Sequence, residues 1–231
     1  MRKNIFWTGG FDSTFRLLQL LEEEDVTEIY LYYIALVIDN IESSDIRRMS
    51  ISYEIETMEL ILKSIDKSKI KKFTIISDQE DLLYFTFQFP YQFMNYIGID
   101  KIEYSDINKV YFFDLYVSGL VLRPITQWGA ITQVLDDLDI NAEICLEKYG
   151  GIWSRINKFV IDGKIQFHKI RSLSAFKRYE MPLFDVSRDS MIDTSIKKGW
   201  LPILELTWSC WYPKNGNQCG KCFTCKRRPL L

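Results

Sequence analysis

Apolar residues recur with two different periods along the chain, and the alternation between them predicts an α/β fold. A short apolar run at 4–7 leads through two glycines into a helical stripe at 15–21. A β-rich run at 28–38 precedes a helix predicted at 51–65, in which apolar residues recur at offsets of 4, 7, 11 and 14 from Ile51. The charged face of that helix is expected to comprise Glu54, Glu56, Glu59 and Lys63. Because strands that alternate with helices pair in parallel, we expect a mostly parallel sheet flanked by helices.

The rest of the chain carries further signals of the same kind. Residues 73–76 predict a third strand, and residues 110–116 predict a fourth buried element. An Asp-Gly pair within 159–167 suits the positive φ angles of a type I′ turn, so this segment predicts a β-hairpin. Residues 189–198 predict a helix, and Gly199 supplies its C-cap.

An aromatic segment and the single histidine fit these elements less clearly. Residues 83–91 follow neither period and are interpreted as loop-rich packing or as a subunit contact in a homodimer, with a surface for stacking a base as the alternative. His168 follows the hairpin without an acid or a nucleophile beside it. That setting favours a surface residue over a catalyst.

Composition narrows the classes of function. With 231 residues and 47% hydrophobic content, the chain can bury one sizeable core, or one core and a small lobe. Its 29 Lys and Arg against 31 Asp and Glu give a net charge of −2, which excludes the overall positive field of nucleic-acid-binding proteins. No apolar run reaches the roughly 18 to 20 residues of a membrane span, and no signal-peptide pattern precedes the first strand, so we expect a cytoplasmic protein without membrane contact.

The turn after the first strand is the first candidate site. Two adjacent glycines let the backbone adopt positive φ and bring its N–H groups against a ligand, while the helix that follows directs its positive end into the turn. This arrangement is typical of an anion site. Asp12 and Ser13 also suit a purely structural role, since both residue types are preferred helix N-caps, but the position after a first strand favours a ligand. The candidate binding residues are Thr8, Gly9, Gly10, Phe11, Asp12, Ser13 and Thr14.

Four clustered cysteines are the second candidate site. Eight residues separate the first two, and two residues separate each later pair. Four thiolates complete the tetrahedral coordination of Zn²⁺, and a closed site of this kind is structural. An iron–sulfur cluster and disulfides are the alternatives. Cys145 is left over and is expected to be a buried free thiol. The predicted zinc ligands are Cys210, Cys219, Cys222 and Cys225.

Taken together, the two sites resemble those of one enzyme family. Residues 8–13, Thr-Gly-Gly-Phe-Asp-Ser, are similar to the SGG-x-DS pyrophosphate loop of the PP-loop ATP pyrophosphatases, with Thr in place of the first Ser. Thr-Trp-Ser-Cys at 207–210 and Cys-Gly-Lys-Cys-Phe-Thr-Cys at 219–225 resemble the zinc signature of 7-cyano-7-deazaguanine synthase, which belongs to that superfamily. Residues 182–199 look like the penultimate helix of the same family.

The resemblance implies a Rossmann-like, PP-loop (HUP-type) ATP-binding domain over residues 1–200, with a zinc-binding segment at 201–231 packed on the same domain. It also implies a ligase that activates 7-carboxy-7-deazaguanine with ATP as an acyl adenylate, releases pyrophosphate, and forms the nitrile precursor of queuosine with ammonia. Asp12 and Ser13 would be the catalytic residues. Amides of the turn, with the Ser13 and Thr14 hydroxyls, would stabilise phosphate charge, and Asp12 would hold Mg²⁺ directly or through water.

The middle of the chain departs from the family and leaves alternatives open. It lacks the Y-G-Q-R-H segment after the second strand, the R-N-T segment, and the Y-P-D-C-R segment that meets the deazaguanine. The nucleophile is therefore either ammonia or a protein amine, the latter as in divergent relatives from antiviral (type IV CBASS-like) operons. A non-catalytic nucleotide-binding partner protein is a further alternative. A tRNA thiolation enzyme ranks last, because it needs a catalytic cysteine pair and Cys145 stands alone outside the cluster.

Overall fold

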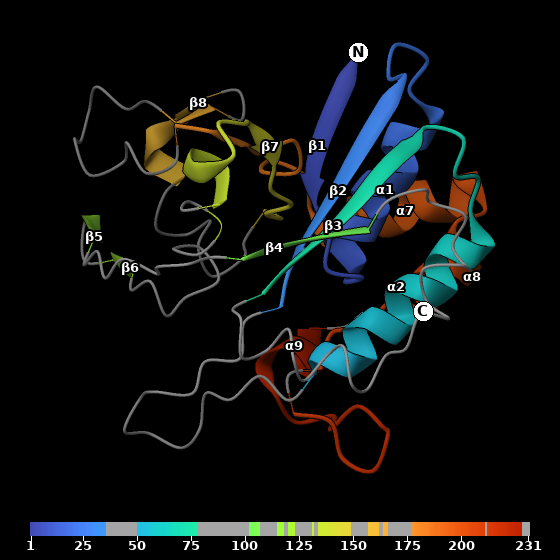
Figure 1. Cartoon of the computed structure of the whole chain (residues 1–231). Helices are drawn as coiled ribbons and strands as arrows, with labels where there is room; N and C mark the ends of the chain where they lie inside the picture. Colours follow the sequence, from blue (N-terminus) through green and yellow to red (C-terminus); the bar gives the residue numbers. More distant parts are fainter. Residues whose placement is uncertain are drawn as a thin grey trace.

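A six-stranded sheet forms the centre of the molecule, and every pair of neighbouring strands in it is parallel (Figure 1). The computed structural model describes residues 1–35, 50–77, 102–106, 115–117, 120–122, 131, 134–148, 157–161, 164–165, 177–210 and 212–227. Across the sheet the strands follow the order β10 (Tyr179–Glu180), β7 (Ala142–Glu143), β1 (Arg2–Phe6), β2 (Glu28–Ile34), β3 (Ile70–Ser77) and β4 (Ile102–Asp106).

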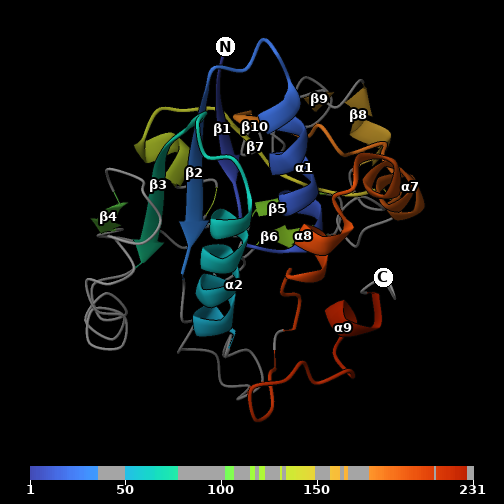
Figure 2. The ribbon, with the colours of Figure 1, turned by 90° about the vertical axis from the view of Figure 1, so that its right-hand side faces the viewer.

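Helices cover the sheet on the side that faces the viewer in Figure 2. The α-helices are α1 (Phe11–Glu22), α2 (Ile51–Ser64), α7 (Arg188–Lys198), α8 (Leu201–Glu205) and α9 (Phe223–Arg227). A 3-10 helix (Asn157–Phe159) and two small antiparallel pairs complete the described elements: β5 (Leu115–Val117) with β6 (Leu120–Leu122), and β8 (Val160–Ile161) with β9 (Lys164–Ile165). The strands point toward the end of the sheet at which α9 and the cysteine segment lie (Figure 2).

The sheet buries both of its faces, as a parallel sheet with crossover helices must. Alternate residues of the strands divide between the two faces: Ile5 and Trp7 pack with α1 and α2, whereas Phe6 packs with the segment that contains β7. The same alternation separates Leu31 from Tyr32 on β2. This explains why the central strands read as continuous apolar runs in the sequence.

The predicted α/β class with a mostly parallel sheet is confirmed. The hairpin predicted at 159–167 is present as β8 and β9, and the helix predicted at 189–198 is α7, which ends at Gly199 with φ 70°. The buried element predicted at 110–116 is not the fourth strand of the sheet, which is β4. Residues 115–116 belong instead to β5 in a separate antiparallel pair, and residues 110–114 lie outside the described residues. The sequence concealed β4 because its five residues carry apolar side chains at only two positions. The aromatic segment 83–91 and His168 also lie outside the described residues.

One member of the predicted charged face of α2 is wrong. Glu54 is buried, with only 3% of its surface exposed, and its carboxylate accepts hydrogen bonds from the Tyr33 hydroxyl at 2.8 Å and the Ser50 hydroxyl at 2.6 Å. Glu59 and Lys63 do pair along the helix surface, as i,i+4 spacing allows. Helical spacing alone does not distinguish a buried acid from an exposed one, and here one of the two donors, Tyr33, lies 21 positions away on β2.

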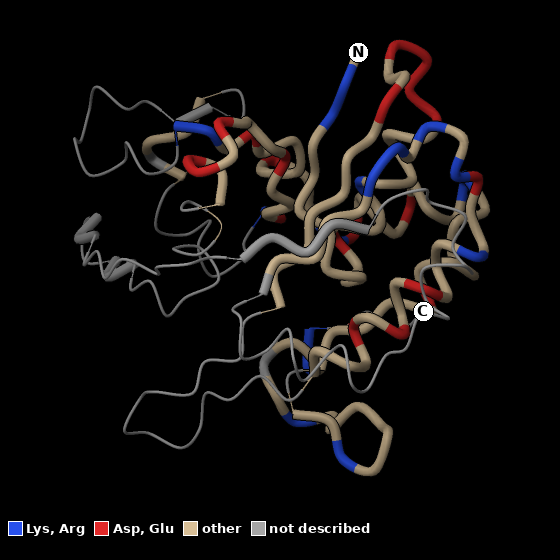
Figure 3. The backbone as a smooth tube through the Cα atoms, viewed as in Figure 1, with Lys and Arg blue, Asp and Glu red and all other residues tan. Residues whose placement is uncertain are grey.

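Charged residues of both signs are distributed along the described backbone, with an acidic turn at 22–25 between α1 and β2 (Figure 3). This mixture agrees with the small net charge of the chain, −2. Among the helices of the described segments, none combines the length and the apolar character that crossing a membrane requires.

A buried ion pair fastens α1 to β7. Arg16 donates from Nε to Glu143 Oε2 at 2.7 Å and from Nη2 to Glu143 Oε1 at 3.0 Å, a bidentate contact. Lys3 adds a second cation 3.1 Å from Glu143. Burial opposes the charge of Arg16, but the hydrogen bonds and charges of Glu143 and Glu23 outweigh it and raise the pKa of Arg16.

We expect Arg16→Met to lower the free energy of unfolding by about 3 kcal/mol, because it leaves the buried Glu143 carboxylate with less compensation. Urea unfolding measures the loss. Arg178→Met is the matched control: Arg178 pairs with Asp136 and Asp139 on the surface, where ion pairs add little, so its unfolding midpoint should hardly change. Equal midpoints for the two variants would contradict a stabilising role for the Arg16 pair.

Candidate functional site

Strand order places the candidate site at the carboxyl end of β1. From β1 the sheet continues through β2, β3 and β4 on one side, whereas β7 and β10 lie on the other side of β1. The segments that follow β1 and β7 therefore leave the sheet in different directions. In open α/β sheets such a switch in strand order opens a crevice for ligands beyond the strand ends. The glycine turn follows β1 directly, and Glu147 follows β7.

Gly9 is the residue of the glycine turn whose conformation excludes other side chains. Its φ is +66°, and a Cβ built on it would lie 2.9 Å from Cγ of Met58 in α2. Its carbonyl accepts a hydrogen bond from the Trp208 backbone N–H at 3.0 Å. Gly10 has φ −78° and is the N-cap of α1. Positive φ, expected to be available to both glycines, is used by Gly9 alone.

Hydroxyl groups close the turn from within. The Ser13 hydroxyl accepts from the Thr8 N–H at 3.3 Å and donates to the Gly10 carbonyl at 3.3 Å. Thr14 is fully buried, and its hydroxyl accepts from the indole N–H of Trp7 at 3.1 Å. Ser13 thus shapes the turn, while Thr14 ties α1 to the end of β1. Their predicted contacts with phosphate stay predictions.

Asp12 is not a helix cap but one end of an ion-pair chain. The cap position belongs to Gly10, and Asp12 Oδ1 instead accepts from Arg188 Nη2 at 2.7 Å. Arg188 is the first residue of α7, and its guanidinium also lies over the ring of Phe11, 4.9 Å from the ring centroid. A basic side chain at a helix N-terminus opposes the helix dipole, so the carboxylates around Arg188 account for its place.

Glu147 continues the chain and connects it with the cysteine segment. Its Oε2 accepts from Arg188 Nε at 2.7 Å, and its Oε1 accepts from Nη2 of Arg227 in α9 at 2.5 Å. A backbone hydrogen bond from the Lys148 N–H to the Val186 carbonyl holds this segment beside the start of α7. Sequence reasoning missed Glu147, Arg188 and Arg227. The one available signal was a carboxylate shortly after a short strand, and that signal is weak.

The surroundings of Asp12 disfavour its charged form. Burial raises the pKa of Asp12, to about 7, and the neighbouring Glu147 acts in the same direction. Arg188 and Arg227 oppose this shift. The ion pair with Arg188 thus favours the ionised form of Asp12, the form that can contact a metal ion or attract a positive group, against the effect of burial.

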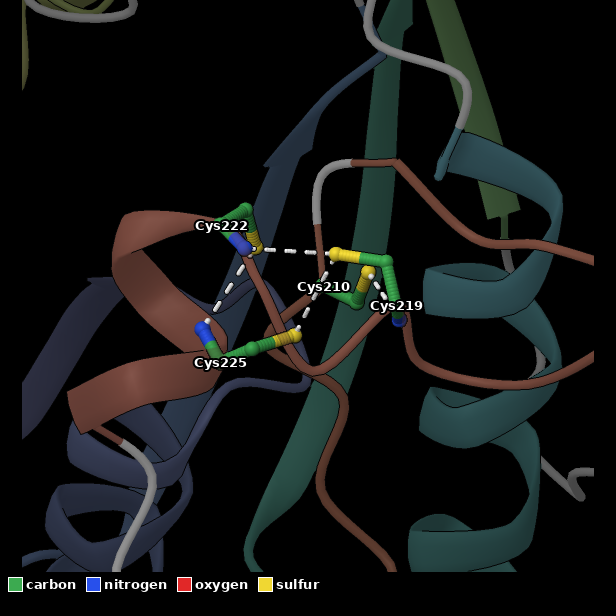
Figure 4. Close-up of side chains that lie close together, drawn as sticks. All are labelled: Cys210, Cys219, Cys222 and Cys225. Atoms are coloured by element: carbon green, nitrogen blue, oxygen red, sulfur yellow. Dashed lines mark hydrogen bonds between the residues drawn. The ribbon is translucent and has the colours of Figure 1, made fainter.

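The four predicted cysteines come together at one point (Figure 4). Their Sγ atoms all lie within 4.8 Å of one another, and Cys219 and Cys225 are 3.9 Å apart. Zn–S bonds of about 2.3 Å in a tetrahedron place sulfur atoms about 3.8 Å apart, so the cluster fits a zinc ion. All four are free thiols in the described structure.

Backbone N–H groups surround the sulfur atoms, as they do in thiolate sites. Cys219 Sγ accepts from the Cys222 N–H at 3.3 Å and from the Lys221 N–H at 3.5 Å, and these contacts lower the pKa of Cys219. Burial raises the pKa of Cys210, and it raises that of Cys225 to about 12. A metal ion must therefore displace protons when it binds. Gly216 and Gly220 adopt positive φ, at 80° and 66°, in the turns around the cluster.

Cys145 has no part in the cluster. It is a free thiol that packs beside the apolar side chains under α1. Burial raises the pKa of Cys145 well above its usual value, with the charge of Glu143 acting in the same direction, and this favours the neutral thiol. The expected free thiol is thus confirmed, but Cys145 is half-buried rather than fully buried.

Gly9→Ala should destabilise the protein more than Gly199→Ala. Both glycines have φ near +70°, which costs a residue with a Cβ about 1–2 kcal/mol, but a Cβ at Gly199 meets no atom within 4 Å. The Gly9 substitution adds the contact with Met58 and disturbs the turn. Chemical denaturation of the two variants measures the difference in unfolding free energy. Equal losses would show that the turn adapts to the added methyl group.

Purified protein should contain about one zinc per chain, because the four-thiolate set is complete. Elemental analysis decides this. Cys222→Ser should lose the metal and unfold at least the last segment, since structural zinc contributes on the order of 10 kcal/mol of binding free energy. Cys145→Ser is the control and should retain the metal. Absence of zinc from the wild-type protein, or full metal content in Cys222→Ser, would refute the assignment.

One comparison with known proteins identifies the C-terminal part of the chain. A family model described as "Queuosine biosynthesis protein QueC" matches residues 165–230. Searches of curated proteins and of solved structures find no match to the chain. The matched residues include the four cysteines, α7 with Arg188, and Arg227. The resemblance inferred from the cysteine spacing is confirmed for this part: residues 165–230 are QueC-like.

Proposed function

We propose that the chain is an ATP-dependent ligase of deazaguanine biosynthesis, which activates a carboxylate at the glycine turn and transfers its acyl group to a nitrogen nucleophile. The substrate acid is a 7-carboxy-7-deazaguanine. One observation carries the proposal: the QueC-like cysteine segment contacts the glycine turn directly, through the hydrogen bond from the Trp208 N–H to the Gly9 carbonyl at 3.0 Å. The part of the chain that matches the family is thus built onto the predicted ATP site.

The positive groups around the turn support binding of a triphosphate. The first N–H groups of α1 have no acceptor within the helix and point toward the turn, where the helix dipole also favours negative charge. Arg188 lies beside them, held by Asp12. Its guanidinium carries five N–H donors, and its ion pairs use those on Nε and Nη2, so it can also donate to a phosphate oxygen.

The reaction has two steps and needs little acid–base chemistry from the protein. A carboxylate oxygen attacks the α-phosphorus of ATP, and the bond to pyrophosphate breaks. A nitrogen nucleophile then attacks the acyl carbon, and AMP leaves with the bonding electrons. Developing phosphate charge is stabilised by the amides of the turn and by Arg188. Asp12 is the nearest carboxylate to hold the Mg²⁺ that accompanies ATP.

The cysteine cluster supports a structural role within this function. Four cysteine ligands complete the coordination of zinc and leave no position for a substrate. A redox or nucleophilic role for these cysteines is therefore not part of the proposal. The cluster instead fixes the chain on both of its sides, with Thr207 to Cys210 against the glycine turn and α9 against Glu147.

Asp12→Asn should reduce the release of pyrophosphate and AMP by about a hundredfold or more, because it removes the carboxylate that holds both Arg188 and the ATP-bound magnesium. The assay uses protein, ATP, magnesium and 7-carboxy-7-deazaguanine, with ammonium as acceptor. Asp25→Asn in the exposed turn after α1 is the control and should keep wild-type activity.

Mass spectrometry of the same reaction identifies the acceptor. A nitrile or amide formed from ammonium assigns a small-molecule product, whereas AMP release without either product directs the search to a protein amine. Wild-type protein that releases no AMP with the deazaguanine acid would refute the proposed substrate. Full activity of Asp12→Asn would refute the proposed site.

A further inference from the structure

Two separate contacts join the cysteine segment to the glycine turn, one on each side of the cluster. Before the cluster, the Trp208 N–H donates to the Gly9 carbonyl. After it, Arg227 begins the ion-pair chain that reaches Asp12. We propose that the metal centre controls nucleotide binding at the turn through this chain, with Arg227 and Glu147 as positioning residues for Arg188. The inference rests on the proposed function, in that the turn is taken to bind the phosphates of ATP.

The chain is short and continuous, and its central carboxylate, Glu147, is shielded from solvent. Arg227 pairs with one oxygen of Glu147, Arg188 pairs with the other, and Arg188 reaches Asp12 with a second nitrogen. Only 7% of the Glu147 side chain is exposed. Solvent screening is therefore weakest at Glu147, whereas the side chains of Arg188, Asp12 and Arg227 are 21%, 25% and 30% exposed. A change at Arg227 is expected to alter how Glu147 holds Arg188, because the one carboxylate makes both ion pairs.

Metal binding determines whether Arg227 is in place. The helix that carries it, α9, has five residues, and helices this short are unstable in isolation. Two predicted zinc ligands fix it: Cys222 directly precedes the helix, and Cys225 lies within it. The Lys226 N–H donates to the Cys222 carbonyl at 3.0 Å inside this turn. Without the metal, α9 loses the two ligand bonds that fix it, and we expect the pair of Arg227 with Glu147 to weaken.

The charge balance gives the direction of the effect. Two carboxylates, Asp12 and Glu147, face two guanidinium groups, Arg188 and Arg227, so the chain is neutral as a unit. Loss of Arg227 leaves a net charge of −1 beside the turn. Glu147 then pairs with Arg188 alone and competes with a phosphate for it. Both effects weaken the binding of an anion.

The contact through Trp208 reinforces the coupling independently of charge. Its indole stacks on Tyr53 of α2, with ring centroids 4.8 Å apart and planes 10° from parallel, and its N–H group on the ring donates to the Cys210 carbonyl at 2.8 Å. Trp208 is thus fixed between α2 and Cys210, the first predicted zinc ligand. We expect metal loss to release both the Trp208 contact with Gly9 and the Arg227 pair with Glu147. Metal loss should therefore affect the turn more than a substitution of Arg227 does.

Arg227→Gln should weaken ATP binding about tenfold while the zinc content stays at the wild-type level, a change within the 5- to 150-fold range typical of coupled sites. Titration calorimetry with ATP and magnesium measures the affinity. Lys226→Gln removes the same charge from an exposed position on the same helix and should bind ATP as the wild type does. In a Glu147→Gln background, Arg227→Gln should change the affinity about twofold or less, because Arg227 acts through Glu147.

Hydrogen exchange provides a readout that requires no nucleotide. Amides of residues 8–14 should exchange several-fold faster after zinc is removed with a chelator, and also faster in Arg227→Gln with zinc retained.

If these rates change but wild-type protein binds no ATP, the coupling stands and the proposed function fails. If exchange and affinity in Arg227→Gln equal those of Lys226→Gln, or if wild-type protein holds no metal, the coupling is overturned. If Arg227→Gln still lowers the affinity tenfold in the Glu147→Gln background, Arg227 contacts the nucleotide directly, and the proposed coupling through Glu147 is overturned.

Discussion

The position of β1 within the parallel sheet determines where the candidate site lies in this molecule. β1 pairs with β2 on one side and with β7 on the other, and the chain reaches β7 only after it has built the other half of the sheet. Since all the strands run in one direction, their carboxyl ends form one edge, and the segments after β1 and β7 separate there. The glycine turn, Glu147 and the cysteine segment all depend on this arrangement.

Local sequence patterns were sufficient for the parts of the site that are themselves local. The four cysteines lie within sixteen residues of one another, so their spacing carried the information, and two glycines between a strand and a helix identified the turn. Strands β1 to β3 and helices α1, α2 and α7 could also be predicted, because each is longer than one period of its apolar pattern.

What the sequence could not reveal depends on contacts between distant residues. Arg188 and Asp12 are 176 positions apart, and Arg227 and Glu147 are 80 positions apart. The same reason contributes to the error at Glu54, which accepts from the Tyr33 hydroxyl 21 positions away, although its second donor, Ser50, is only four positions away. Asp12 was interpreted from its neighbours in sequence as a cap or a magnesium ligand, but the structure adds a partner that no spacing rule could supply. Strand β7, with two residues, is too short to show a period at all.

The hydrogen bond between Trp208 and Gly9 also has a consequence for how the protein is made. The glycine turn lies near the start of the chain, yet the groups that complete its surroundings are supplied by residues up to 227. The residues of the six strands therefore leave the ribosome before the residues that complete the surroundings of the turn. Contacts of such large separation form late, because the chain entropy of closing the loop must be overcome first. A polypeptide that stops short of α9 contains all six strands of the sheet but lacks Arg227, which pairs with Glu147 beside the turn.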